Sequence, residues 1–439
     1  MKKSTIKYST LQWTALLITV IIVLMPFHAF LTVWLSSLFG HYTALRLWKE
    51  ALLVVAGIGA IFLLITDKKI RNNTLSRRLV WLILAYLALN VLWGVIGYFG
   101  GDLSAKALGY GLIVNCRYLI FFLIVWAVAL RTDRLRNNWQ KMVLWPAVVV
   151  VIFGILQFTV LPNDFLKHFG YGVSTIEPFE TVNSNSNYIR IASTLRGANP
   201  LGVYLIIPIT FLAMLIMRGK RTWQYISLLG GALLALAFTF SRSAWIGTGL
   251  ALSTLGAINL EGRKINKKYF VTPLIALLIL ASGAYLLRDN SSFQNVVFHT
   301  EDRSTIKVSS NQGHLKAKTE GLIDVANHPL GFGPGSAGPA SIYNSSPARI
   351  AENYYLQIGQ ELGWIGLILF VTIIVGVAYL LWLNRADPLA LGLFASLVGI
   401  SAANMLMHYW ADDTLAYIWW GLAGIAMAPI HVKVKKKRY

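Results

Sequence analysis

Arginine, histidine and glutamate residues at the edges of long apolar stretches are the strongest candidates for chemistry in this sequence. Arg196 lies in STLRGANPLGVYL and Arg242 in TFSRSAWIG, each beside an apolar stretch. Arginine stays charged when partly desolvated, and its planar guanidinium binds phosphate oxygens in a bidentate way. His314 and Glu352 lie in a long polar segment and have side chains that accept protons from hydroxyl groups. Together these residues favour attack of a hydroxyl on a group carried by a pyrophosphate.

Lys49 and Arg117 are two further candidates for pyrophosphate binding. Lys49 precedes Glu50 at the start of an apolar stretch, and Arg117 lies about midway along another. Ionisable groups in such places are costly, so they usually face a cavity or a partner. The alternative for Lys49 is snorkelling or pairing with Glu50, and for Arg117 it is an ion pair inside a helix bundle.

The identity of the general base stays open within the segment 288–353. The candidates there are His314, Glu320, His328 and Glu352. Glu352 directly precedes an apolar stretch, where partial burial raises the pKa of a carboxyl group and suits it to this role. Alternatively, it stabilises the positive N-terminal end of the following helix. Glu361, deeper in that stretch, is expected to be a buried hydrogen-bonding partner.

The glycine-rich run HPLGFGPGSAG admits two interpretations. It resembles a phosphate-binding loop, but it lacks the Gly-Lys-Ser/Thr ending of such loops. A tight loop that packs close to helices explains it at least as well. No metal-binding pattern is present in the sequence, and we expect neither a metal nor a cofactor.

The composition predicts an integral membrane protein. The chain has 439 residues, of which 56% are hydrophobic and 13% charged, and apolar runs of membrane-spanning length recur along it. Cys116 is the single cysteine, which excludes an intramolecular disulfide. The net charge of +21 comes mostly from short loops between apolar runs, where it sets membrane orientation. A nucleic-acid partner is therefore not expected, whereas membrane lipids are.

The hydropathy pattern predicts an all-α polytopic protein forming a single membrane domain over residues 1–439. We expect twelve transmembrane helices, near 11–36, 48–66, 79–99, 106–130, 140–161, 198–217, 223–240, 243–260, 269–287, 354–383, 387–408 and 413–431. The first apolar run is too long for a cleaved signal peptide, so we expect a retained signal-anchor helix.

Loop charge predicts the orientation of these helices. Basic loops alternate with loops poor in lysine and arginine, and both termini are basic, so both termini are expected in the cytoplasm. Two long loops, 162–197 and 288–353, are then extracytoplasmic. In the second, the pattern from Leu315 to Ala326 predicts a short amphipathic helix that ends at His328–Pro329.

Four motifs in order resemble the O-antigen ligase/polymerase superfamily of integral-membrane glycosyltransferases. They are STLRGANPLGVYL, TFSRSAWIG, GHLKAKTEGLIDVANHPLGFGPGSAG and AENYYLQIGQELGWIGLILF, within residues 190–372. The resemblance implies a helical, GT-C-like glycosyltransferase fold in the cytoplasmic membrane and a glycan donor linked to undecaprenyl pyrophosphate. It also implies that Arg196 and Arg242 hold the donor pyrophosphate. The acceptor hydroxyl then attacks the anomeric carbon with inversion and without a metal, on the extracytoplasmic side.

One departure from the family pattern bears on the acceptor. Ligases of this superfamily that act on lipopolysaccharide or protein usually have histidine before the asparagine of the last motif, where this sequence has Glu352. We therefore expect polymerisation of repeat units of a surface polysaccharide, with ligation of the glycan to a lipid, cell-wall polymer or protein as the alternative. A reaction that needs little help from a base also stays open. A transporter of lipid-linked sugars is a third hypothesis, but the sequence lacks the paired halves typical of transporters.

Overall fold

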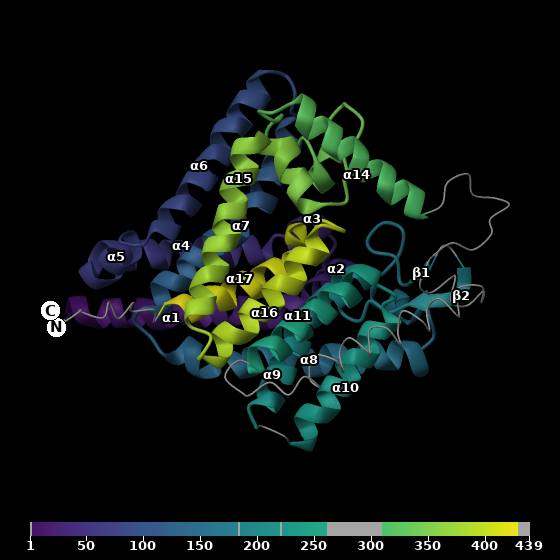
Figure 1. Ribbon diagram of the computed structural model, residues 1–439, viewed down its shortest axis with the longest axis horizontal. Helices are drawn as coiled ribbons and strands as arrows, with labels where there is room; N and C mark the ends of the chain where they lie inside the picture. Colours follow the sequence, from purple (N-terminus) through teal and green to yellow (C-terminus); the bar gives the residue numbers. More distant parts are fainter. Residues whose placement is uncertain (1, 183–184, 220–221, 261–309, 429–439) are drawn as a thin grey trace.

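The computed structural model describes residues 2–182, 185–219, 222–260 and 310–428. The predicted span 269–287 and most of the N-terminal half of the second long loop lie outside the described residues. Within them, long helices form a bundle, and the loops between them carry short 3-10 helices and one small hairpin (Figure 1).

The first half of the chain is almost entirely helical. Its helices are α1 (Lys2–Leu24), η1 (Met25–Phe27), α2 (His28–Phe39), α3 (Tyr42–Leu45), α4 (Trp48–Thr66), α5 (Lys68–Leu75), α6 (Arg78–Phe99), α7 (Ala105–Ala129) and α8 (Arg134–Thr159). The first long loop then holds η2 (Phe165–Phe169) and the two strands β1 (Glu180–Val182) and β2 (Asn185–Arg190).

The second half continues the bundle. Its helices are α9 (Ala198–Met217), α10 (Trp223–Phe238), α11 (Arg242–Leu260), α14 (Ser310–Asn327), η4 (Gly338–Tyr343), α15 (Tyr354–Leu383), α16 (Pro388–Asn404), η5 (Tyr409–Ala411) and α17 (Asp413–Met427). A helix is present at the predicted position as α14, which ends directly before His328–Pro329 as expected. Of its predicted apolar face, Val325 is buried, whereas Leu315, Leu322 and Ile323 are exposed.

Seven described helical segments are long and apolar enough to cross a membrane, compared with twelve predicted. The first of them runs from Ile6 to Phe39 and joins α1, η1 and α2. The predicted spans 223–240 and 387–408 are shorter helices than expected, because α10 and α16 have only 16 and 17 residues. The helical membrane architecture is therefore confirmed, whereas the number of spans is not.

The antiparallel hairpin β1–β2 is the only β-sheet among the described residues. Glu180 pairs with Arg190 and Thr181 with Ile189, and the register shifts before Val182 pairs with Asn185. The hairpin lies at the end of the bundle away from α5 (Figure 1).

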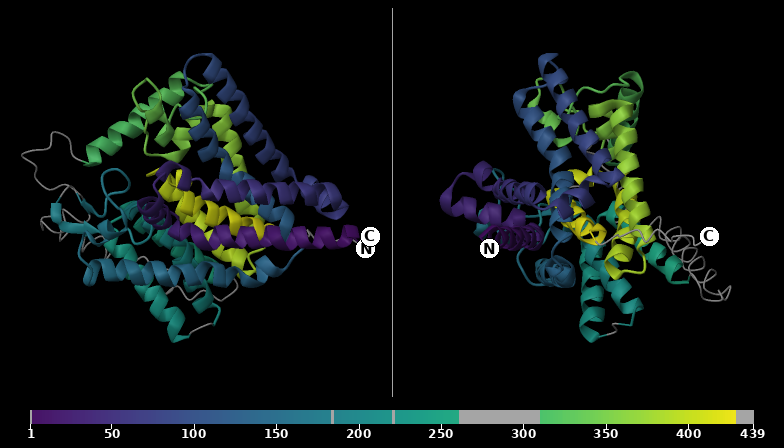
Figure 2. Two further views of the ribbon diagram at one scale, coloured as in Figure 1. Left: turned by 180° about the vertical axis from the view of Figure 1, so that it is seen from behind. Right: turned by 90° about the vertical axis from the view of Figure 1, so that its left-hand side faces the viewer.

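The centre of the bundle is formed by α7, α9, α16 and α17. In the most apolar windows of α7 and α9, 72% and 78% of residues are buried, compared with 33% for α4. Tyr118 of α7 packs against Trp410 of η5 and against Trp420 of α17. The backbones of α11 and α16 lie in close contact at Gly247 and Gly399, because glycine has no side chain to keep membrane helices apart. Figure 2 shows the remaining helices arranged around this centre.

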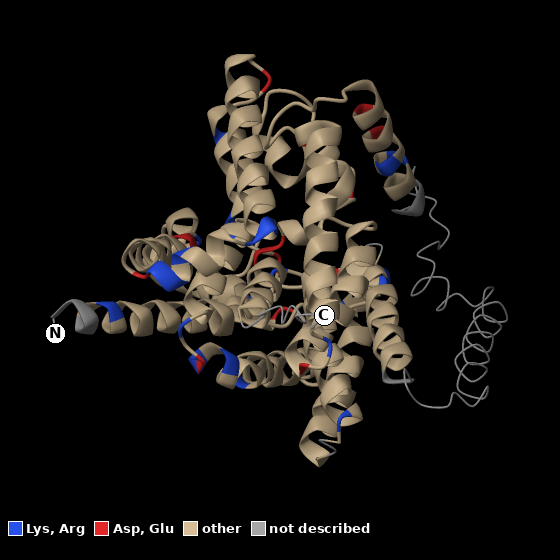
Figure 3. Cartoon of the chain, turned by 60° about the vertical axis from the view of Figure 1, so that its left-hand side comes forward, with Lys and Arg blue, Asp and Glu red and all other residues tan. Residues whose placement is uncertain are grey.

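The loops that sequence analysis assigns to the cytoplasm contact one another. Asp67 after α4 forms ion pairs of 2.7 Å with Lys7 of α1 and 2.7 Å with Arg131 after α7. Burial acts to raise the pKa of Asp67, but the hydrogen bonds from Lys7 and Arg131 outweigh it and lower the pKa to about 2. Arg136 of α8 likewise pairs with Asp387 before α16 at 2.8 Å. Charged residues are otherwise sparse along the long helices (Figure 3).

The two long loops assigned to the other side contact other parts of the bundle. Side-chain hydrogen bonds to backbone carbonyls link Thr194 to Pro26, Arg190 to Thr239, and Asn353 to Met405. These bonds attach both long loops to the bundle, and the side of the membrane on which the loops lie stays a prediction.

The glycine-rich loop before α15 packs against helix backbones. Gly335 has a φ of 93°, and a Cβ there would collide with the carbonyl of Ala107 in α7. Opposite this loop, α15 is interrupted at Gly363, whose backbone is not helical. The buried carboxylate of Glu361 accepts hydrogen bonds from Asn115 at 2.6 Å and from the Gly335 amide at 3.0 Å. These contacts favour the packing interpretation of HPLGFGPGSAG, with Glu361 as a buried hydrogen-bonding partner.

Candidate active site

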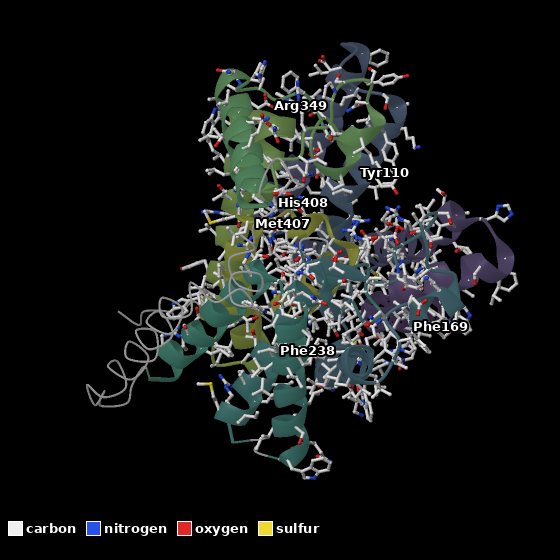
Figure 4. The ribbon with its side chains drawn as sticks, turned by 90° about the vertical axis from the view of Figure 1, so that its right-hand side faces the viewer. Tyr110, Phe169, Phe238, Arg349, Met407 and His408 are labelled. Atoms are coloured by element: carbon white, nitrogen blue, oxygen red, sulfur yellow. The ribbon has the colours of Figure 1, made fainter. Side chains whose placement is uncertain are left out.

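A cavity of about 620 Å³ opens at the end of the bundle that carries the hairpin. It contains three of the residues predicted from sequence, namely Arg242, His314 and Glu352. The rest of its lining is Thr181, Val182, Arg190, Asn199, Phe240, Ser243, Ile246, Leu315, Lys318, Leu406 and Met407. Segments far apart in the sequence therefore line one cavity, whose wall contains both polar and apolar side chains. Figure 4 shows Met407 at the middle of this face, between α14 and the end of α10 that carries Phe238.

His314 and Glu352 form a hydrogen-bonded pair in this cavity. His314 is in the second turn of α14, and its Nδ1 contacts Oε2 of Glu352. Glu352 lies directly before Asn353, the N-cap residue of α15. Burial acts to raise the pKa of Glu352, but the hydrogen bond and charge of His314 outweigh it, so the pKa is below its ordinary value. Glu352 is therefore a carboxylate at neutral pH and can hold the imidazole in one orientation.

The backbone at Glu352 is strained to make this contact. Its φ is 50°, a left-handed value that is uncommon outside glycine. Phe240, which lines the same cavity, has a φ of 48°. Of the four described non-glycine residues with positive φ, these two line the cavity. Strained backbone concentrates at functional sites because the surrounding structure must hold it in place.

Arg242 enters the cavity from a tight turn between two helices, as predicted. It is the first residue of α11, and three residues separate it from the end of α10. Ser243 beside it hydrogen-bonds the hydroxyl of Tyr409, which fixes the start of α11 against η5. Phosphate groups bind well at such a position, since the first amides of a helix point toward the ligand.

Arg196 lies in an adjoining cavity of about 210 Å³ rather than in the main one. Asn199 and Met407 line both cavities, so the two are neighbours. The Arg196 guanidinium lies 3.7 Å from Asp412, and its side chain is 58% exposed. This guanidinium is accessible to a ligand, and Asp412 holds it near the cavity.

His408 and Asp412 beside Arg196 were not selected as site residues from the sequence. Burial, followed by the positive charge of Arg196, lowers the pKa of His408 to about 4, so its imidazole is neutral at neutral pH. Burial raises the pKa of Asp412, although Arg196 opposes this. The run HYWADD contains both residues, but nothing in its composition indicates that Arg196 is their neighbour.

Arg190 was also missed, and it braces the wall of the cavity. Its guanidinium donates to the carbonyl of Thr239 at 2.8 Å and to Asn199 at 2.6 Å, and it pairs with Glu180 at 3.4 Å. It therefore fastens the hairpin to the α10–α11 turn and to the start of α9. The sequence carries no signal for this role because the hairpin itself was not predicted.

Lys49 and Arg117 lie in a buried group of charges and line none of these cavities. Lys49 is 2.9 Å from Asp413 and 3.1 Å from Glu50, while Arg117 contacts both carboxylates as well. His28 completes the group at 3.5 Å from Asp413. This is the pairing alternative considered from sequence, and direct contact of Lys49 or Arg117 with pyrophosphate stays a prediction.

Replacing Lys49 by methionine distinguishes the two roles. Lys49 is 1% exposed, so its loss leaves the partly buried carboxylates of Glu50 and Asp413 with one fewer cation. We expect a loss of about 3 kcal/mol in stability, measured as a lower Tm in detergent. Lys69→Met, at an exposed position of α5, is the matched control and should leave Tm unchanged. An unchanged Tm with a raised KM for donor would instead indicate ligand binding.

The fold and the cavity define an integral-membrane protein with a polar site at one end of a helix bundle. The family model for O-antigen ligases matches residues 226–371, which include Arg242, His314 and Glu352. The match confirms the resemblance seen in the four motifs, and over residues 226–371 the chain is similar to the O-antigen ligase family, which implies a glycosyltransferase-type enzyme. No curated protein gives a significant match to the sequence.

Proposed function

We propose that the protein polymerises repeat units of a surface polysaccharide, taking them from an undecaprenyl-pyrophosphate-linked donor at the outer face of the cytoplasmic membrane. The observation that carries this proposal is the meeting of Arg242, His314 and Glu352 in one cavity, with Arg196 in the adjoining one. Cations and a proton acceptor at one surface are what transfer from a pyrophosphate to a hydroxyl requires.

In the proposed reaction, the acceptor hydroxyl oxygen attacks the anomeric carbon of the donor sugar. The bond between that carbon and the pyrophosphate oxygen breaks, and undecaprenyl pyrophosphate leaves with the bonding electrons. Arg242 and Arg196 stabilise the negative charge that develops on the leaving group. His314 takes the proton of the hydroxyl, and Glu352 orients and stabilises the resulting imidazolium, because its carboxylate contacts Nδ1.

Loop charge, together with the contacts among the basic loops, supports the proposed side of the membrane. The loops joined through Asp67 and Asp387 carry the lysines and arginines that mark the cytoplasmic side. The cavity is lined by residues of the other set of loops and of the helix ends beside them, so we propose an extracytoplasmic site and a cytoplasmic N-terminus.

Ligation to a different acceptor is the second candidate function, favoured by the description of the matching family as O-antigen ligase. The chemistry at the donor is the same in both cases, and only the molecule that supplies the hydroxyl differs. The glutamate at position 352 supports polymerisation over ligation for the reason given from the sequence.

Product analysis separates these functions. Purified protein given a synthetic undecaprenyl-pyrophosphate oligosaccharide should produce a ladder of longer lipid-linked glycans. Consumption of donor only after a lipid or protein acceptor is added would indicate a ligase. Movement of the donor across a vesicle bilayer without a new glycosidic bond would indicate a transporter and would overturn the proposed function.

A further inference from the structure

Phe240 occupies a backbone position that suits glycine. It lies in the turn between α10 and α11, and its φ of 48° is left-handed. Helices commonly end on such a residue, which is usually glycine because a side chain is strained there. Two backbone hydrogen bonds hold this turn in place. The Phe240 amide donates to the carbonyl of Ala237 at 3.1 Å, and the Ile191 amide donates to the carbonyl of Phe238 at 3.2 Å. An aromatic residue at this position needs a reason other than local backbone preference.

The ring of Phe240 lines the 620 Å³ cavity, partly buried and on the same turn as Arg242. Among the described aromatic residues it has no ring-to-ring partner, unlike Phe238 two positions earlier, which stacks on Phe158 at 3.6 Å. Aliphatic side chains such as Ile246 and Leu406 already supply apolar wall in this cavity. The ring therefore adds a flat face that those residues do not offer.

A flat aromatic face beside a phosphate-binding cation matches the two ends of a sugar phosphate. The apolar C–H groups on one face of a pyranose are drawn to the negative face of an aromatic ring, and the phosphate is drawn to the guanidinium. Because only Ser241 lies between Phe240 and Arg242, a sugar stacked on Phe240 would be the one joined directly to the pyrophosphate.

We infer that Phe240 is a specificity-determining residue that stacks on the first sugar of the donor. This inference rests on the proposed function and adds to it the sugar subsite. The strained backbone is then explained, because the turn must hold both the ring and Arg242 toward one cavity.

Binding of two probes to the purified protein tests this inference. The first probe is geranylgeranyl pyrophosphate, which has no sugar. The second is the same C20 polyprenyl pyrophosphate carrying one sugar, prepared in several versions with different hexoses or N-acetylhexosamines. With Phe240→Leu, we expect affinity for the best sugar-bearing probe to fall about tenfold and affinity for the sugar-free probe to stay unchanged. Phe240→Tyr should retain the affinity of the wild type, since it keeps the ring.

Phe240→Gly separates the ring from the backbone. Glycine relieves the positive φ, so the Tm should not fall, but the sugar-bearing probe should still bind about tenfold more weakly. Equal losses for both probes, or no loss for either, would overturn the role of Phe240. It would also be overturned if the sugar adds nothing to binding by the wild type. Failure of the wild type to bind either probe would instead contradict the proposed function.

Discussion

Arg242→Ala is expected to lower kcat/KM for the lipid-linked donor by about 10²–10³-fold, with little change in Tm. The reason is that the guanidinium at the start of α11 stabilises charge on the departing pyrophosphate, which grows as the glycosidic bond breaks. The loss should appear mainly in kcat, because the interaction is strongest in the transition state. The measurement is the initial rate of glycan elongation with the synthetic donor.

Three further variants sharpen this prediction. Arg242→Lys keeps the charge but loses the bidentate fork, so it should retain part of the activity. Arg196→Ala should lose activity to a similar or smaller extent, since its side chain is 58% exposed and lies in the adjoining cavity. Arg71→Ala removes an exposed charge from α5, at the other end of the bundle, and should have full activity. Full activity of both Arg196→Ala and Arg242→Ala would remove the assigned donor site.

His314→Asn is expected to lower kcat by about 10²–10³-fold, the usual contribution of a general base. Glu352→Gln should lower kcat about tenfold to a hundredfold, because it leaves the imidazole in place without its carboxylate partner. The double variant should be little worse than His314→Asn, since the two residues act as one unit.

Two neighbours on or beside α14 serve as controls for this pair. Glu320 is exposed and pairs with Lys316 at 3.8 Å, and His328 packs on Phe332 outside the cavity lining. Both were candidates for the base from sequence, and Glu320→Gln and His328→Ala should keep activity. Full activity in His314→Asn and Glu352→Gln would rule out base catalysis by either and favour a reaction that needs little base help.

The same pair makes a pH-dependent contribution to stability. The pKa of Glu352 is lower in the folded protein than its ordinary value, so its carboxylate stabilises the fold above that ordinary pKa. This contribution is lost as the pH falls through the lowered pKa. The difference in Tm between the wild type and Glu352→Gln should therefore be largest near neutral pH and shrink in acid.

Local features of this structure could be predicted from the sequence because their causes are local. The helix from Ser310 to Asn327 follows from its apolar spacing and from the proline after it. The tight turn that carries Arg242 follows from two apolar runs separated by four polar or small residues. Hydropathy also identified most of the long helices, although α10 and α16 are shorter than predicted.

Contacts between distant segments could not be predicted. Arg117 pairs with Asp413, 296 positions away, and no pattern in either segment indicates the other. The β1–β2 hairpin was missed because its strands of 3 and 6 residues are too short for a clear alternation of polar and apolar residues. The His314–Glu352 contact depends on the packing of α14 against α15, which hydropathy alone does not describe.

The most direct test of the proposed site is the position of a bound donor. An electron cryomicroscopy structure with a non-transferable undecaprenyl-pyrophosphate sugar analogue would show it. We predict pyrophosphate oxygens within hydrogen-bonding distance of Arg242 and Arg196, and the anomeric carbon in the cavity beside His314. Binding of the pyrophosphate elsewhere, for example in the apolar groove of about 560 Å³ between α1 and α4, would contradict it.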